Sequence, residues 1–229
     1  RQHAGHHGNW NNLDRRESGT DIYSTCLTVV EYEALSPWQR LLYRITRHPI
    51  VTLLILPPFI FLLLYRVPFD TPKAWRKERL VVHLTNAALL AIAIGMGLAI
   101  GFGEVAMVQL PISAIAAVFG VWLFSIQHRF EGTLWLRRDR WNPVAVSLQG
   151  SSFLRLPRIL QWFTGNIGYH HIHHLNSHVP NYRLQECHEA VPALADVPTL
   201  NLWQGLRSFR FVLWDEAQQR MVRFPRRRR

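Results

Sequence analysis

The residues of this chain that could do chemistry are its histidines, because seven of the twelve fall in two short clusters. One cluster lies at residues 3–7 (HAGHH) and the other at residues 170–174 (HHIHH), and both contain the pattern H-x-x-H-H. Positions i, i+3 and i+4 of a helix lie on one face, and imidazole is a good ligand for iron, zinc, copper and nickel. Each cluster is therefore predicted to present three imidazoles to a metal ion. The candidate ligands are His3, His6, His7, His170, His173 and His174.

Together the two clusters offer more nitrogen ligands than one metal ion can use well, so they predict a dinuclear centre. Solvated surface histidines would explain one such cluster, but two copies make that explanation weak. A zinc hydrolase is the alternative metal site. Catalytic zinc usually has three protein ligands and a water, and a protease signature places a glutamate between its histidines as H-E-x-x-H. Neither cluster contains that glutamate, and ligand sets of nitrogen with open positions favour oxygen activation.

Apolar stretches must bring the two distant clusters together. The stretches at 80–100 and 105–126 each provide the ~20 residues that a helix needs to cross a hydrocarbon core of ~30 Å, and they are predicted to be transmembrane helices. A third stretch, at 49–66, carries Pro57 and Pro58 in its middle. Proline removes a backbone donor and clashes with the preceding turn. This stretch is therefore predicted to be a re-entrant or interfacial element and not a straight span.

The positions of Lys and Arg predict the topology. Positive residues favour the cytoplasmic side of short loops. They flank the 49–66 stretch on both sides and follow the second span, whereas residues 101–104 between the spans carry none. Two spans then place residues 1–48 and 127–229 on the same, cytoplasmic face, where they form a helical cap that carries both histidine clusters. The predicted fold is an all-α integral membrane protein.

The net charge of +11 indicates an anionic partner. No zinc-finger, ribonucleoprotein or basic-zipper pattern is present, so nucleic acid is not expected. The basic residues instead flank apolar stretches and crowd the end of the chain at 226–229. Such clusters beside membrane segments are attracted to anionic lipid headgroups, by about 1 kcal/mol per residue. The membrane surface is therefore the expected partner. The two cysteines, Cys26 and Cys187, have the spacing of neither a disulfide framework nor a thiolate zinc site.

At these residues the sequence resembles the membrane fatty acid desaturases, which share their histidine boxes with alkane hydroxylases and carotenoid oxygenases. The run at 165–176 (GNIGYHHIHHLN), followed by VPNY at 179–182, is similar to the third box of bacterial desaturases, particularly in the omega-6-like, acyl-lipid branch. Residues 12–16 (NLDRR) and 28–32 (TVVEY) are similar to the segment that follows their second box. The similarity extends over nearly the whole chain.

The resemblance implies a centre of two iron ions that uses O2 to introduce a cis double bond into an acyl chain. The implied substrate is a fatty acyl lipid, an acyl-CoA or an acyl carrier protein, and the implied electron donor is ferredoxin or a cytochrome b5-like protein. The implied location is the bacterial inner membrane, with the histidine boxes on the cytoplasmic face. A further family ligand lies just past the last span, where this chain has His128, although Phe124 stands where some relatives have an additional asparagine ligand. Asn166 and His171 are candidates for orienting the ligands from behind.

Members of this family also carry a first box, H-x-x-x-H, upstream of the second. No such box precedes His3. We therefore expect residues 1–229 to be a single desaturase domain that is truncated at its N-terminus, lacks two ligands and does not turn over by itself. Two other functions stay open: a hydroxylase or ketolase of the same superfamily, and a membrane metal-binding protein without turnover.

Overall fold

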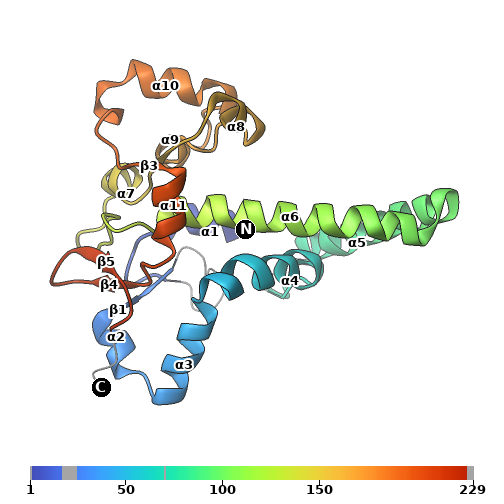
Figure 1. The fold of residues 1–229 in the computed structure, drawn as a ribbon, viewed down its shortest axis with the longest axis horizontal. Coiled ribbons are helices and arrows are strands. Elements are labelled where there is room, and N and C mark those ends of the chain that lie inside the picture. The colour runs from blue at the N-terminus through green and yellow to red at the C-terminus, as the bar shows by residue number, and fades with distance from the viewer. Residues whose placement is uncertain (1, 17–24, 70, 226–229) are drawn as a thin grey trace. The chain divides into compact units, whose positions relative to one another are not determined.

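The structure is a computed structural model that describes residues 2–16, 25–69 and 71–225, and it divides into two compact units (Figure 1). The membrane unit contains residues 48–122. The cap unit combines the described residues of 2–47 with those from Leu123 onward. The arginines at 226–229, which entered the prediction of a lipid partner, lie outside the described residues.

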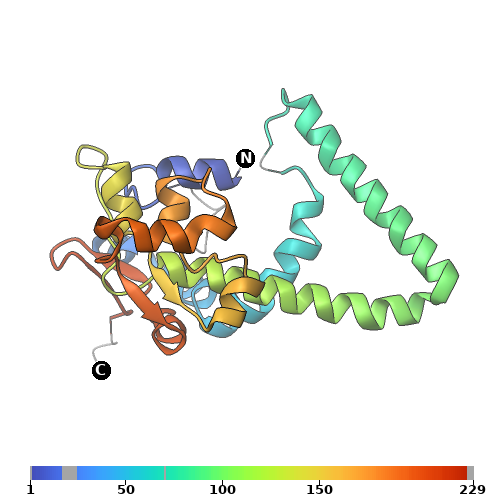
Figure 2. The same ribbon diagram turned by 90° about the horizontal axis from the view of Figure 1, so that it is seen from above.

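Among the described residues, two helices are long and apolar enough to cross a membrane. They are α5 (Arg76–Ile100) and α6 (Phe102–His128), and a turn at Gly101 joins them (Figure 2). Gly101 has a φ of 99°, a left-handed conformation that glycine adopts at little cost. Nearly all side chains of α5 are exposed, as expected for a helix that lipid surrounds. The prediction of an all-α membrane fold with two transmembrane helices is confirmed.

The apolar stretch before α5 is broken into short helical segments. It consists of the π-helical segment η1 (Val51–Ile55), the helix α4 (Leu56–Leu62) and the 3₁₀ turn η2 (Leu64–Arg66). Pro57 and Pro58 lie in the first turn of α4, where a missing backbone N–H costs least. Only together with α3 (Pro37–Thr46) are residues 51–66 long and apolar enough to cross a membrane, and the chain bends by 56° at the break between the two segments. The stretch is thus the predicted proline-broken element.

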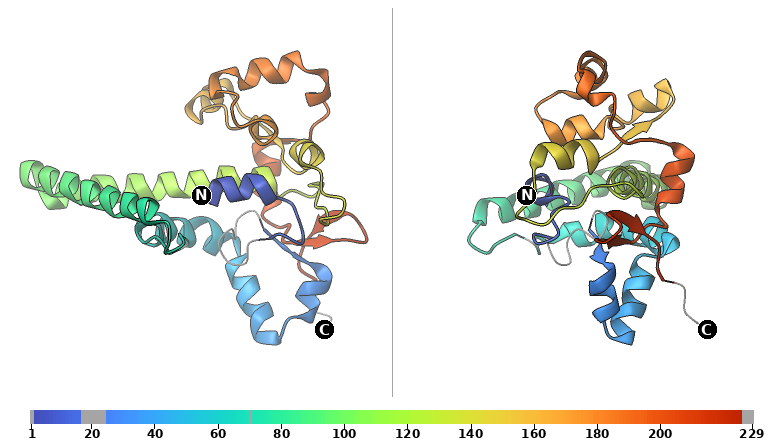
Figure 3. Two further views of the ribbon diagram at one scale, coloured as in Figure 1. Left: turned by 180° about the vertical axis from the view of Figure 1, so that it is seen from behind. Right: turned by 90° about the vertical axis from the view of Figure 1, so that its left-hand side faces the viewer.

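The cap unit consists of short helices and two small sheets (Figure 3). The first sheet has the order β1-β4-β5, with β1 parallel to β4 and β4 antiparallel to β5, and the second pairs β2 with β3 in parallel. The strands are β1 (Leu27–Thr28), β2 (Phe153–Arg155), β3 (Thr199–Asn201), β4 (Leu213–Asp215) and β5 (Arg220–Val222). The remaining helices are α1 (Gln2–Asn9), α2 (Val29–Ala34), α7 (Pro143–Gln149), α8 (Arg158–Phe163), α9 (His170–Leu175), η3 (Asn181–Arg183), α10 (Leu184–Ala190), η4 (Pro192–Leu194) and α11 (Leu202–Ser208).

The segment that follows the first histidine cluster is held by the core of the cap unit. Trp214 and Met221 are completely buried, and Leu13 and Cys26 pack in the same apolar cluster. Asn11 donates its amide hydrogens to the carbonyl oxygens of Leu134 at 2.7 Å and Gly150 at 3.1 Å. The chain leaving α1 is therefore tied to the segment that follows α6.

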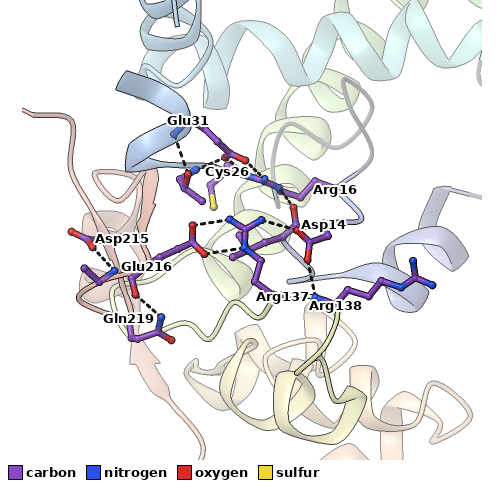
Figure 4. A network of polar contacts seen from close by, with 12 residues as sticks. Asp14, Arg16, Cys26, Glu31, Arg137, Arg138, Asp215, Glu216 and Gln219 are labelled. Atoms are coloured by element: carbon purple, nitrogen blue, oxygen red, sulfur yellow. Dashed lines mark hydrogen bonds and ion pairs between the residues drawn. The ribbon is translucent and has the colours of Figure 1, made fainter. Parts of the chain in front are cut away.

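A polar network reinforces this tie (Figure 4). The guanidinium group of Arg137 donates to both carboxylate oxygens of Glu216, at 2.9 and 2.8 Å, and to Asp14 at 2.6 Å. The backbone N–H of Arg138 donates to the other oxygen of Asp14 at 2.8 Å. These two contacts hold the pKa of Asp14 below its ordinary value, the backbone hydrogen bond having the larger effect. Arg137 thus joins the segment after α1 to the segment between β4 and β5.

Candidate metal centre

The predicted ligands lie on two helices of the cap unit and at the end of α6, whose residues from Leu123 onward belong to that unit. The first cluster is on α1, the second is on α9, and His128 is the last residue of α6. The anchor of α9 is Ile172, which is 1% exposed and packs in an apolar cluster with Phe153 and Tyr169. His170, His173 and His174 then face α1 and the end of α6.

The structure brings all seven histidines together in two groups. In the outer group the imidazole nitrogens lie within 4.8 Å of one another, and the same holds for three members of the inner group. The fourth inner member, His170, has its Nε2 atom 2.8 Å from Nε2 of His128 and 3.0 Å from Nε2 of His174. The outer group is His3, His7 and His173, and the inner group is His6, His128, His170 and His174.

Each histidine cluster is shared between the two groups, whereas the sequence predicted one cluster for each ion. At 100° per residue, positions i and i+4 of a helix differ by about 40°, but position i+3 lies about 60° to the other side. In each helix the i and i+4 histidines therefore point together, and the i+3 histidine joins the pair of the other helix. His6 thus lies with the pair from α9, and His173 lies with the pair from α1.

The spacing within the outer group fits a metal ion. Its three Nε2 atoms form a nearly equilateral triangle, with His3 and His7 3.2 Å apart, His3 and His173 3.2 Å apart, and His7 and His173 3.1 Å apart. Two ligands at a right angle and ~2.1 Å from an ion would be about 3.0 Å apart. The triangle therefore has a size that three ligands of one ion could have.

The inner group also fits a cation better than a hydrogen-bonded cluster. Nε2 of His128 lies 3.1 Å from that of His6, 2.8 Å from that of His170 and 3.1 Å from that of His174. One ring nitrogen offers either one proton or one lone pair, so these three contacts are not all hydrogen bonds. The Nδ1 atoms of His128, His170 and His174 are buried and have no hydrogen-bond partner among the described residues. A proton on each Nδ1 leaves the Nε2 lone pairs free to bind a cation.

Burial keeps the ligands in the form that binds metal. Desolvation, followed by the charges of neighbouring histidines, lowers the pKa of His7 from 6.5 to about 4. The same causes, in the same order, lower the pKa of His170 and His174 well below 6.5, and the pKa of His3 and His173 is lowered too. A lowered pKa favours the neutral imidazole, which is the ligating form.

Aromatic rings close the inner group against water. The ring of Trp10 stacks on His174 with a centroid distance of 3.9 Å. Phe124 lies one turn before His128, with its ring 5.1 Å from that of His6 and 5.2 Å from that of His128. Phe124 therefore contributes an apolar wall at the place where some relatives have an asparagine ligand.

The two residues predicted to orient the ligands have other neighbours. The amide nitrogen of Asn166 donates to the carbonyl oxygen of Asn181 at 3.0 Å, so its side chain ties the loop before α9 to the loop after it. His171 is completely buried, and its Nε2 lies 3.2 Å from Nδ1 of His188 on α10. His188 was not singled out by the sequence, because it lies outside both clusters and only the packing of α10 on α9 brings it to His171.

The sequence of the chain matches a known family and a known protein. The family described as "Fatty acid desaturase" matches residues 1–205. The chain is 44% identical over 222 residues to a protein of Bacillus subtilis (strain 168) named "Fatty acid desaturase". The aligned region is 97% of this chain and 62% of that protein, so the chain spans less than two thirds of the length of its relative.

Proposed function

Because the chain belongs to the membrane fatty acid desaturase family, we propose that its histidine centre binds two iron ions and serves the O2-dependent introduction of a cis double bond into a fatty acyl chain. One observation carries the proposal: seven histidines converge in two groups whose nitrogen–nitrogen distances suit metal ions. The outer group would hold one ion and the inner group the other. Imidazole ligands suit iron, and open positions suit oxygen chemistry.

The bound ions would supply the oxidising power that removal of hydrogen from an unactivated methylene pair requires. In the overall reaction, two hydrogen atoms leave adjacent carbons, and O2 becomes two waters with two further electrons and two protons from a donor. The chain contributes neutral ligands, and Trp10 and Phe124 contribute apolar rings that cover the inner group. Exclusion of water protects such chemistry from side reactions.

The same centre would also support hydroxylation, which is the second candidate function. The outcome depends on which carbon faces the ions, and a misplacement of about 1 Å can cost on the order of a hundredfold in rate. A hydroxylase or ketolase of the same superfamily therefore differs from a desaturase in the geometry of its substrate site and not in its ligands. Membership of the desaturase family favours desaturation.

The partners in this proposal follow from the resemblance and from the charge of the chain. The substrate would be a fatty acyl lipid, acyl-CoA or acyl carrier protein, and the electrons would come from ferredoxin or a cytochrome b5-like protein. We place the cap unit on the cytoplasmic face of a bacterial inner membrane, since Lys and Arg flank the 49–66 stretch on both sides and follow the second span. Anionic headgroups would then neutralise part of the net charge of +11.

The direct test is analysis of membrane fatty acids by gas chromatography and mass spectrometry. The host would express the chain together with any native sequence that precedes it and a reductase system. A new double bond that disappears in His173→Ala, but persists in the exposed neighbour variant His178→Ala, is the expected result. A hydroxy or keto product would instead identify an oxygenase. Unchanged lipids from a protein that retains two irons would count against the acyl-lipid substrate.

A further inference from the structure

Helix α3 has its polar and apolar faces reversed with respect to a surface helix of a soluble protein. Trp38 is 69% exposed, Leu41 45%, Leu42 51% and Ile45 46%. These four residues have the spacing i, i+3, i+4 and i+7, so they form one continuous stripe along the helix. We refer to them as the apolar stripe of α3.

The opposite face of α3 turns its arginines toward the protein. Nε of Arg40 donates to the carbonyl oxygen of Leu35 at 2.9 Å, and Nε of Arg44 donates to the hydroxyl of Tyr32 at 2.6 Å. The guanidinium carbon of Arg44 also lies 4.7 Å from the ring centroid of Phe224. Arg47, which follows the helix, is only 6% exposed. The cationic groups are thus drawn away from the apolar stripe.

The orientation of α3 is determined by specific contacts. Ser36 and Gln39 form a reciprocal capping box at its first turn, and Pro37 occupies the first helical position. The hydroxyl of Tyr43 donates to the carbonyl oxygen of Val212 at 2.9 Å and accepts from the backbone N–H of Leu27 at 3.1 Å. Figures 1 and 3 show α2 and α3 together at one edge of the cap unit. These contacts hold α3 in an orientation in which the apolar stripe lies on the outer surface of the cap unit.

The position of α3 in the chain indicates what covers the stripe. The apolar segment η1–α4 begins only five residues after α3 ends, at Val51, so in the sequence α3 directly precedes an apolar stretch with the composition of a membrane segment. Ten residues of helix are about 15 Å long, which is too short to cross a core of ~30 Å. Trp38 at its start is a residue type that favours the membrane–water interface.

We propose that α3 lies in the boundary between lipid headgroups and acyl chains, parallel to the membrane, with its apolar stripe against the acyl chains. Helices of this kind bury their apolar face about 5–10 Å into the boundary. Arg40 and Arg44 donate to groups of the cap unit on the opposite face, so no guanidinium group of the helix would have to enter the acyl layer. Through Tyr43 and the β1–β4 pair, this contact fixes the cap unit to the membrane surface independently of the transmembrane helices.

The test is the accessibility of spin labels on the full chain in vesicles of phosphatidylethanolamine and phosphatidylglycerol. Labels would be attached singly at Leu41→Cys, Leu42→Cys and Ile45→Cys, in a Cys187→Ser background; Cys26 is 3% exposed and will not react. The matched control is Gln185→Cys, an exposed position on α10. All labelled residues are exposed, so the core of the cap unit is not disturbed.

The expected result is a high collision rate with oxygen and a low one with a water-soluble nickel chelate at all three α3 positions, and the reverse at position 185. High nickel accessibility along α3 would overturn the proposal, because the stripe would then face water. Low accessibility to both reagents would also overturn it, since a protein and not lipid would cover the stripe. None of these readings depends on metal content or turnover, so they are independent of the proposed enzymatic function.

Discussion

At the scale of single residues, the histidines show what spacing in a sequence can and cannot reveal. The two H-x-x-H-H clusters and the resemblance identified all seven residues that the structure brings together. Their division between two groups was not predicted, because it depends on how α1 and α9 face each other. The spacing nevertheless allows this division. On a helix the i+4 histidine lies about 40° from the first histidine and the i+3 histidine about 60° to the other side, so the i+3 histidine can contact a different group.

His188 provides a prediction that tests the role of His171. Replacement of His188 by Ala removes the contact with His171, the residue after His170 on α9, and should weaken metal binding by less than the roughly 10- to 100-fold that loss of a direct partner of a ligand costs. Replacement by Asn keeps a polar atom near the position of Nδ1 and should retain most of the affinity. Titration of the purified chain with Fe(II) would measure both effects. Equal affinities in His188→Ala and wild-type protein would show that the pair is only packing.

The lowered pKa of His7 leads to a prediction about the metal-free protein. This pKa is about 4 in the folded chain and 6.5 ordinarily, so the unfolded chain binds more protons between these values. The free energy of unfolding should therefore fall as pH decreases from 6.5 toward 4, and this contribution should be constant above 7. Urea unfolding at several pH values measures this effect, and the free energy of unfolding of His7→Gln should depend less steeply on pH than that of the wild-type protein. A control variant at an exposed residue that carries no titratable group, Gln185→Ala, should keep the wild-type slope.

At the scale of elements, hydropathy and proline positions were sufficient for the membrane helices but not for the strands. A stretch such as α5 is recognised because its length and composition leave few alternatives. The strands have two or three residues each, which is too short for an alternating pattern to emerge. They depend instead on partners far away in sequence, as β1 at Leu27 depends on β4 at Leu213.

The Arg137 network makes a prediction about the element that follows α1. Arg137→Gln breaks two partly exposed ion pairs and should destabilise the cap unit by about 1 kcal/mol. Arg138→Gln is the control, because only the backbone of Arg138 contacts Asp14. Chemical unfolding at pH 7 would measure the difference between the two variants.

The same network predicts a pH dependence for that difference. The pKa of Asp14 is lowered in the folded chain, so its contribution to stability is present above the ordinary value of about 3.9 and is lost as pH falls through the folded value. The destabilisation by Arg137→Gln should accordingly shrink as the medium becomes more acidic. If Arg137→Gln is equally destabilising in strong acid, the loss of stability comes from packing and not from the ion pair with Asp14.

At the scale of the whole molecule, counting spans led to the expectation that the two ends of the chain share one side of the membrane. The structure builds the cap unit from these two segments, residues 2–47 and those from Leu123 onward. The internal arrangement of the cap was beyond prediction, since it results from many short elements without periodic patterns. Span parity is informative because a membrane allows only two sides.

The topology can be measured with a membrane-impermeant thiol reagent on bacterial cells that have lost the outer membrane but keep an intact inner membrane. Gly103→Cys, near the turn between α5 and α6, should react. Gln218→Cys, at an exposed position between β4 and β5, should react only after the membrane is opened. The opposite pattern would place the histidine centre on the outer face.

The distance along the chain between the two histidine clusters has a consequence for synthesis. His3 and His173 are separated by 170 residues, and the transmembrane helices are made between them. At translation rates of about 5–20 residues per second, the first cluster waits roughly 10–30 s for its partner. During this interval the histidines of α9 that complete both groups have not been made. Under the proposed function, metal loading would therefore be a late event that follows synthesis of α9.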